Sequence, residues 1–312
     1  NDFWIENFPP AAGEGEVRPH GLLYAVDGIT GREPRGFYHE GTRTGVLVNT
    51  DLYASLRSLA LGLAMDIGAG TGGAGSTGAV RGMSADLDGN GLILVGPPGT
   101  RKTELFFELL ADRRFRVHSN DIVFVEIAGG RAVADRVERK LYLPTSAVEL
   151  DARLAPLLDR SKCENVVVHK DDCADAECQR GDDCRLDRGS PYCYKAAKEA
   201  HALLDPDWLG GPAAAVRRTV LRTLVLLRND ATSPAVVELS KDEALRALEA
   251  GEAAGAKKSL GAGKAQPFHN PHLLGDGPER IEAQRAFFGR LLDAVRPVLF
   301  NSGVAGADKL KD

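Results

Sequence analysis

The feature that most constrains the fold is a glycine-rich turn between an apolar run and a helical pattern. Residues 92–95 are Leu-Ile-Leu-Val, and residues 96–103 read Gly-Pro-Pro-Gly-Thr-Arg-Lys-Thr. Over residues 104–111, apolar residues recur three and four positions apart, which predicts a helix. A strand that leads through a tight turn into a helix is typical of α/β folds. We therefore expect an α/β protein.

The turn has the residue types of a phosphate-binding loop. Gly96 and Gly99 allow backbone N–H groups to point inward, and the start of a helix after Thr100 adds partial positive charge. Lys102 would reach the β- or γ-phosphate, and the Thr103 hydroxyl would bind Mg²⁺. The segment predicts a site for ATP, another nucleotide or a polyphosphate. An ordinary Gly-Pro turn is the alternative.

Arg101 departs from the usual loop, which has glycine directly before the lysine. A Cβ at this position crowds the phosphates unless the loop opens or the side chain turns outward as an extra cation. We count Arg101 among the nucleotide-binding residues. The identity of the phosphoryl donor and the catalytic competence of the loop both depend on it.

A carboxylate stands at the head of the next strand-like run, residues 121–127. Asn120 and Asp121 precede its valine, phenylalanine and isoleucine residues. At this spacing behind a phosphate loop, Asp121 would hold Mg²⁺ or act on an attacking hydroxyl. A polar entry to an ordinary strand is the alternative.

Several segments together resemble the superfamily of phosphoenolpyruvate carboxykinase and HPr kinase. The loop with its strand and helix, residues 95–110, and the Asn120-Asp121 pair are similar to that superfamily's P-loop and Asp-Asp pair. Further similar segments follow in the same order, and the resemblance covers residues 82–303. They are residues 83–86, 138–142, 164–168, 227–244, 267–268 and 300–303.

The resemblance implies an α/β, mixed-sheet, carboxykinase-type P-loop kinase domain over residues 81–312. Residues 1–80 would form a small N-terminal region with a glycine-rich linker. A helical period runs from Asp51 to near Met65, and seven of the fifteen residues 68–82 are glycine. We expect that stretch to be a flexible connection or a loop that closes over a ligand. Further helices are expected at 194–204, 240–250 and 279–295, and further strands at 166–168, 220–227, 235–238 and 297–300.

The resemblance also implies roles for individual residues. Lys102, Asp121 and Glu138 would be catalytic, and Asp121 would take the proton of the attacking hydroxyl. Thr103 and Asp121 would bind Mg²⁺. Two positions depart from the family, because its metal-binding histidine falls on Gly82 and the first acid of its pair is Asn120.

The function that follows is a Mg²⁺-dependent kinase that transfers a phosphoryl group from ATP, or another nucleotide, to a hydroxyl of a small molecule or a protein. Decarboxylation of oxaloacetate is not expected, because the chain is much shorter than the carboxykinases. The rival hypothesis is a non-catalytic nucleotide sensor or scaffold of the same fold. Arg101, Gly82 and Asn120 favour that rival, since loss of catalysis would leave departures of this kind.

All five cysteines lie in residues 163–193, which we interpret as an insertion. Cys173, Cys178, Cys184 and Cys193 would wrap one structural Zn²⁺ as thiolates. Disulfides are the second interpretation, and free or cluster-binding thiols the third. A zinc-organised interaction module would require this insertion to project from the domain.

Composition limits the partners. Lys and Arg number 39 against 44 Asp and Glu, a net charge of −5, so a nucleic-acid partner or an anionic membrane is not expected. No apolar run approaches the roughly 20 residues of a membrane span. Because the cysteines cluster and the first residues show no signal-peptide pattern, we expect a cytoplasmic protein. The sequence does not indicate an oligomeric state.

Overall fold

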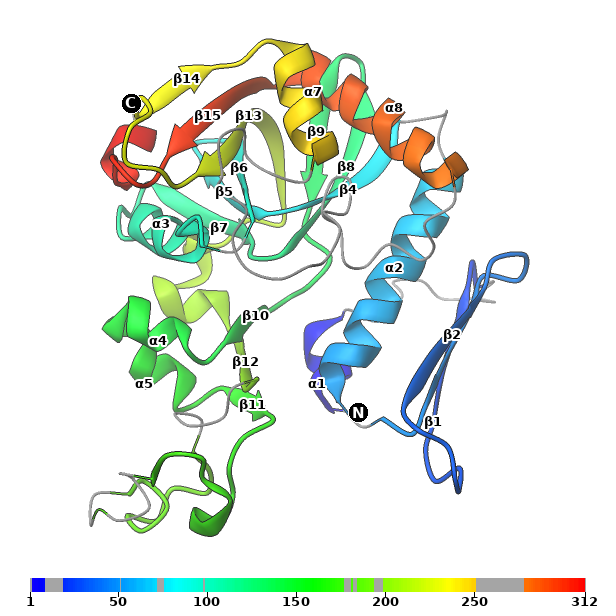
Figure 1. The fold of residues 1–312 in the computed structure, drawn as a ribbon, viewed down its shortest axis with the longest axis vertical. Helices are drawn as coiled ribbons and strands as arrows, with labels where there is room; N and C mark the ends of the chain where they lie inside the picture. Colours follow the sequence, from blue (N-terminus) through cyan, green and yellow to red (C-terminus); the bar gives the residue numbers. More distant parts are fainter. Residues whose placement is uncertain are drawn as a thin grey trace.

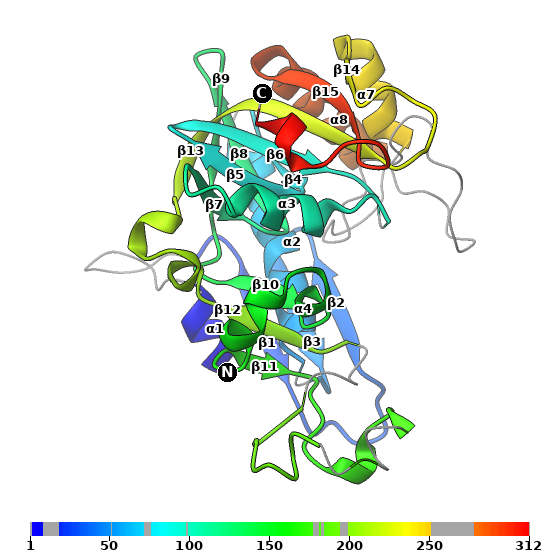
Figure 2. The same ribbon diagram turned by 90° about the vertical axis from the view of Figure 1, so that its left-hand side faces the viewer.

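The computed structural model describes residues 2–8, 19–50, 52–71, 76–97, 99–176, 181, 184–193, 199–250 and 278–311. It is a mixed α/β structure (Figure 1), as the sequence predicted. A large sheet with its helices forms the upper part, and two smaller three-stranded sheets lie below it. Figure 2 shows the same arrangement from the side. No helix among these residues is both long and apolar enough to cross a membrane.

The large sheet has nine strands in the order β4-β8-β9-β13-β6-β5-β7, with β15 against β13 and β14 against β15. It is mixed, because β13 runs parallel to β6 and β15 while its other pairs are antiparallel. Its strands are β4 (Thr77–Arg81), β5 (Met83–Leu87), β6 (Asn90–Val95), β7 (Phe115–Ser119), β8 (Ile122–Ala128), β9 (Arg131–Asp135), β13 (Arg218–Arg228), β14 (Val236–Glu238) and β15 (Arg296–Asn301).

Both faces of this sheet are covered. Successive side chains of a strand point to opposite faces. On β13, Val225 and Leu227 pack with Phe106 of α3 (Lys102–Leu110), whereas Leu224 and Leu226 pack in the core that contains α7 (Lys241–Ala250) and α8 (Pro278–Ala294). Two-sided burial explains why β13 is a nearly continuous apolar run.

The N-terminal part is a three-stranded sheet on one long helix. The sheet has the order β1-β3-β2 and is formed by β1 (Leu22–Val26), β2 (Arg35–His39) and β3 (Thr44–Val48). It packs against α2 (Tyr53–Thr71), and α2 also contacts β4 of the large sheet. The helix predicted from Asp51 is therefore confirmed, but it extends past Met65.

Most described residues of the predicted glycine-rich connection belong to regular elements. Gly68 to Thr71 are the last turn of α2, and Thr77–Arg81 is β4. Gly78 has no room for a side chain, because a Cβ there would lie 2.6 Å from the ring of Phe287 of α8. The expectation of a flexible linker is thus wrong for both segments, and close packing fixes the β4 part.

A second small sheet, β10-β12-β11, lies beside short helices from the N-terminal end and the middle of the chain. Its strands are β10 (Leu141–Pro144), β11 (Lys162–Glu164) and β12 (His201–Leu204). The short helices are α1 (Asp2–Asn7), α4 (Ala147–Leu150) and α5 (Ala155–Leu158), and 3-10 turns are η1 (Ala152–Leu154), η2 (Lys170–Asp172), η3 (Pro206–Leu209), η4 (Pro212–Ala214) and η6 (Ala307–Leu310).

Two of the predicted elements are wrong here. The last residues of the helix expected at 194–204 form β12, where Ala202 and Leu203 are buried between two antiparallel strands. Residues 166–168 contain only an isolated bridge between Val167 and Cys193. The remaining predicted strands correspond to β8, β13, β14 and β15, and the other predicted helices to α7 and α8.

Candidate functional site

The glycine-rich turn connects β6 to α3 as a tight loop. Gly99 has a φ of +86°, which favours glycine. A Cβ on Gly96 would lie 2.7 Å from the hydroxyl of Thr100 and 2.8 Å from the Cβ of Leu227. The buried Thr100 hydroxyl donates a hydrogen bond of 2.8 Å to the carbonyl of Pro97. Both glycines therefore have a structural reason at their positions.

Arg101 adopts the backbone conformation that usually requires glycine. Its φ is 56°, in the left-handed region. The side chain lies against α3, where Nε donates to Glu104 Oε2 at 2.7 Å and Nη1 to the carbonyl of Ser302 at 2.9 Å. Hydrogen bonds to Glu104 raise the pKa of Arg101. Glu104 and Ser302 therefore hold the guanidinium. These contacts do not turn it toward the loop, where the sequence predicted it as an extra cation for phosphate.

The N-terminus of α3 remains open to an anion. Among the described residues, no side chain caps this terminus, and the first helical hydrogen bond runs from the N–H of Leu105 to the carbonyl of Arg101. The N–H groups of a helix's first turn have no partner inside the helix. They carry partial positive charge and favour phosphate.

Lys102 is half-buried at the base of the loop. Its Nζ lies 3.3 Å from the carbonyl oxygen of Gly96. Burial and, to a smaller extent, Arg81 lower the pKa of Lys102 to about 8, although Asp121 opposes both effects. Asp121 lies beside the end of β6, where the loop begins, because the N–H of Gly82 donates to its carbonyl at 2.7 Å and a Cβ on Gly82 would lie 2.7 Å from the carbonyl oxygen of Leu94. The adjacent Thr103 is half-buried in the first turn of α3.

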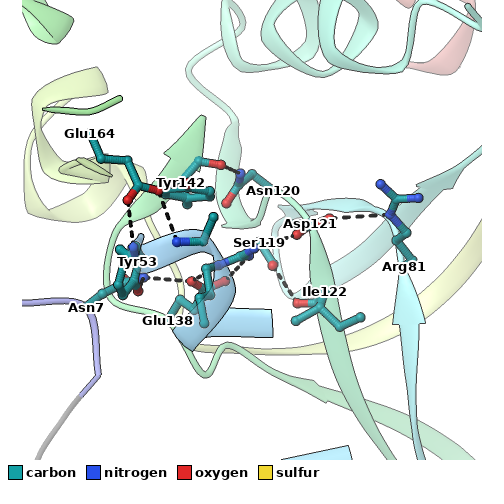
Figure 3. A network of polar contacts seen from close by, with 12 residues as sticks. Asn7, Tyr53, Arg81, Ser119, Asn120, Asp121, Ile122, Glu138, Tyr142 and Glu164 are labelled. Carbon is teal, nitrogen blue, oxygen red and sulfur yellow. Dashed lines mark hydrogen bonds and ion pairs between the residues drawn. The ribbon is translucent and has the colours of Figure 1, made fainter. Parts of the chain in front are cut away.

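Asp121 precedes β8 and lies between two arginines (Figure 3). Its Oδ2 is 2.9 Å from Nη1 of Arg57, and its Oδ1 is 3.7 Å from Nε of Arg81. Arg57 comes from α2, and Arg81 is the last residue of β4. The site is therefore built from residues of the large sheet and of α2.

Glu138 is buried and is linked to Asp121 through Arg57. Arg57 donates from Nε and Nη2 to the two carboxylate oxygens of Glu138, each at 2.6 Å, and Asn7 donates to Oε1 at 2.7 Å. Burial disfavours the charged guanidinium, but Glu138 and Asp121 outweigh it and raise the pKa of Arg57. Asn120 is also buried, and its Nδ2 donates to the carbonyl of Tyr142 at 2.7 Å. Asn120 therefore contributes a hydrogen bond to the network, at a position where a second acid would contribute a negative charge.

Sequence analysis did not identify Arg57 or Arg81. A signal for Arg57 was present, since Tyr53, Arg57, Leu61 and Met65 are spaced four residues apart and all are buried. An arginine on the apolar stripe of a helix needs a buried partner. Arg81 had no such signal, because it follows a glycine-rich stretch that gives no period.

The residues that the sequence predicted as Mg²⁺ ligands, Thr103 and Asp121, offer one hydroxyl and one carboxylate. This small set suits Mg²⁺, which is commonly held by one or two carboxylates together with substrate phosphates and water. Within the described residues, no three His, Cys, Asp or Glu side chains are grouped so as to hold a metal alone.

The cysteine segment is described in part. Cys173, Cys184 and Cys193 are buried and Cys163 is half-buried, and none of these four forms a disulfide. Cys178 lies outside the described residues, as do residues 267–268 of the resemblance. The four-cysteine zinc site therefore stays a prediction. Burial raises the pKa of the Cys163 thiol.

Comparison with known proteins gives little on which to base an assignment. No family model matches the chain, and no curated protein matches it. Among solved structures, the HPr(Ser) kinase/phosphatase from Coxiella burnetii is similar, with 13% identity and a TM-score of 0.27, over 50% of this chain and 69% of that chain. A TM-score this low is a distant resemblance and establishes neither a family nor an activity.

Proposed function

We propose that this chain is a nucleotide-dependent phosphotransferase. It would transfer a phosphoryl group from a nucleoside triphosphate to a hydroxyl of a small molecule or a protein. The observation that carries the proposal is the position of Asp121 beside the end of β6, where the loop with Lys102 and the uncapped N-terminus of α3 begins. Phosphoryl transfer needs these two parts, a cationic phosphate cradle and a carboxylate for the attacking hydroxyl.

The electrostatics of the loop that would bind the phosphoryl donor favour an anion. The positive charge of Lys102 is held at a cost, since burial and Arg81 both disfavour it. Phosphate oxygens near Nζ would remove that cost. The open N–H groups of α3 and the left-handed turn at Gly99 provide further donors. The sequence resemblance supports the same assignment for Gly96, Thr100 and Thr103.

On the acceptor side, Asp121 takes the proton. The acceptor oxygen forms a bond to the γ-phosphorus, the bond from that phosphorus to the β–γ bridging oxygen breaks, and a nucleoside diphosphate leaves. The hydroxyl proton passes to the carboxylate of Asp121. Glu138 contributes by holding Arg57, which in turn holds Asp121, so Glu138 is a positioning residue.

Thr103 and Asp121 are the residues that would hold Mg²⁺. When bound, the ion would neutralise charge on the β- and γ-phosphate oxygens.

A non-catalytic nucleotide sensor is the second candidate. Two observations favour it. Arg101 is tied to Glu104 in a strained conformation, and both oxygens of Asp121 face guanidinium groups. A sensor would keep the phosphate cradle without transferring the phosphoryl group.

Turnover separates the two candidates. The protein would be incubated with Mg²⁺ and γ-labelled ATP or GTP, together with a panel of alcohols, sugars and serine peptides, and transfer of label followed. A kinase transfers label, and Lys102→Ala and Asp121→Asn abolish transfer, while Asp242→Asn on the exposed face of α7 leaves it unchanged. Tight nucleotide binding without transfer to any acceptor would support the sensor.

A further inference from the structure

Arg81 is a charged residue of the site that the mechanism above does not use. We propose that Arg81 binds the transferred phosphoryl group and stabilises the negative charge on its oxygens during transfer. This inference rests on the proposed function and adds a catalytic residue to it.

The contact between Arg81 and Asp121 is loose. Nε lies 3.7 Å from Asp121 Oδ1, longer than a hydrogen bond. The Nε atom is buried, and it makes no hydrogen bond with any described residue. A buried N–H without an acceptor is costly. Because Nε itself has no accessible surface, a phosphoryl oxygen would bind the outer guanidinium nitrogens, on the exposed part of the side chain.

Asp121 has a closer cationic partner than Arg81. Arg57 donates to Asp121 Oδ2 at 2.9 Å, and its side chain is only 4% exposed, whereas that of Arg81 is 29% exposed. Arg57 is thus the close, buried partner of the carboxylate. Arg81 remains accessible for a ligand.

Backbone pairing fixes Arg81 between the phosphate-donor side and the acceptor side of the site. On β4 it pairs with Ile122 of β8, and the N–H of Gly82 donates to the carbonyl of Asp121 at 2.7 Å. Arg81 is also close enough to Lys102 to disfavour the charge of that lysine. In Figure 3 its outer guanidinium nitrogens point away from Asp121. Arg81 therefore adjoins both the donor-binding lysine and the proton-accepting carboxylate.

Arg57 is shared between the carboxylates of Asp121 and Glu138, whereas the ion pair of Arg81 with Asp121 is 3.7 Å long. A transferred phosphoryl group would give Arg81 a closer anionic partner. The planar guanidinium of arginine suits its equatorial oxygens, and arginines that stabilise this transition state accelerate phosphoryl transfer by about 10³- to 10⁵-fold.

The test compares Arg81→Gln, Arg81→Lys and Arg81→Ala with the parent protein. Arg131→Gln, at an exposed position that begins β9, is the matched control. For each protein, kcat is measured with the best acceptor, and Kd is measured for ADP alone and for ADP with aluminium fluoride, which mimics the transferred group. Free guanidinium ion is then added to Arg81→Ala and, as a control, to Lys102→Ala.

We expect Arg81→Gln to keep the Kd for ADP within about threefold and to lose kcat by about 10³-fold or more. The tighter binding with aluminium fluoride should disappear in this variant. Guanidinium should restore activity to Arg81→Ala and not to Lys102→Ala. If Arg81→Gln does not fold, Arg81→Lys decides, with an expected loss of at least about tenfold, because lysine lacks the planar fork.

A kcat within about threefold of the parent in Arg81→Gln would overturn the inference and leave the proposed function standing. So would a loss of kcat matched by an equal loss of ADP binding, because that result indicates a structural role. A parent protein that neither binds nor turns over nucleotide would overturn the proposed function, and the role of Arg81 with it.

Discussion

Replacing Lys102 by methionine should make the protein more stable while removing its phosphate site. Burial and Arg81 lower the pKa of Lys102 from its ordinary 10.5 to about 8. At about 1.4 kcal/mol per pH unit, the charged lysine opposes folding by roughly 3 kcal/mol. Methionine keeps much of the packing and loses the 3.3 Å contact to Gly96, which is worth about 1 kcal/mol. The net expectation at pH 7 is a gain of about 2 kcal/mol.

The pH dependence of this gain follows from the same pKa. Below about pH 8, Lys102 is protonated in both the folded and the unfolded chain, so its full cost is present. As the pH rises from about 8 towards 10.5, the folded protein loses the proton first, and the unfolded chain binds more protons. The stability of the parent therefore rises relative to the variant, and the difference between them shrinks.

Urea unfolding of both proteins at pH 7 and pH 10 measures the effect. At pH 7, saturating ATP should stabilise the parent by about 2.7 kcal/mol at a concentration of 100 Kd and should leave Lys102→Met unchanged. A variant that is less stable than the parent at pH 7, or a difference that does not change with pH, would refute the reasoning.

Three further predictions concern the surroundings of the loop. Arg57→Met should cost about 3–5 kcal/mol in urea unfolding, because Glu138 is left buried without its cation, and a much smaller loss would contradict that burial. Arg101→Gly should change stability by less than about 1 kcal/mol, since relief of the left-handed strain offsets the lost bonds to Glu104, and a larger loss in thermal unfolding would argue against strain. Protein purified without chelators should release one Zn²⁺ per chain when its thiols are alkylated, and metal analysis that finds none would exclude the four-cysteine site.

The central unit was predictable because its determinants are local. Gly96 and Gly99 require a turn, the apolar run before them is a strand, and the period after them gives α3. The start of α7 is equally local, because the N–H of Ser240 donates to Oε2 of Glu243 at 2.8 Å and the N–H of Glu243 donates to Oγ of Ser240 at 3.3 Å, which is a capping box. These features need no knowledge of distant residues.

Other features depended on contacts between distant segments. The sheet pairing that makes residues 201–204 a strand is with β10 and β11, and neither partner can be inferred from the local pattern. The ion pairs of Arg57 join α2 to residues 64 and 81 positions away. Sequence reasoning placed Asp121 and Glu138 in one site through a resemblance, but it did not find the arginine that connects them.

The most direct test of the account is whether the loop binds a triphosphate through Lys102. The ³¹P NMR spectrum of ATP with Mg²⁺ would be recorded with the parent protein, with Lys102→Met and with the exposed control Arg131→Gln. The account predicts that the β- and γ-phosphate resonances shift or broaden with the parent and the control and stay at their free positions with Lys102→Met. Unchanged resonances with the parent protein, or equal changes with Lys102→Met, would contradict it.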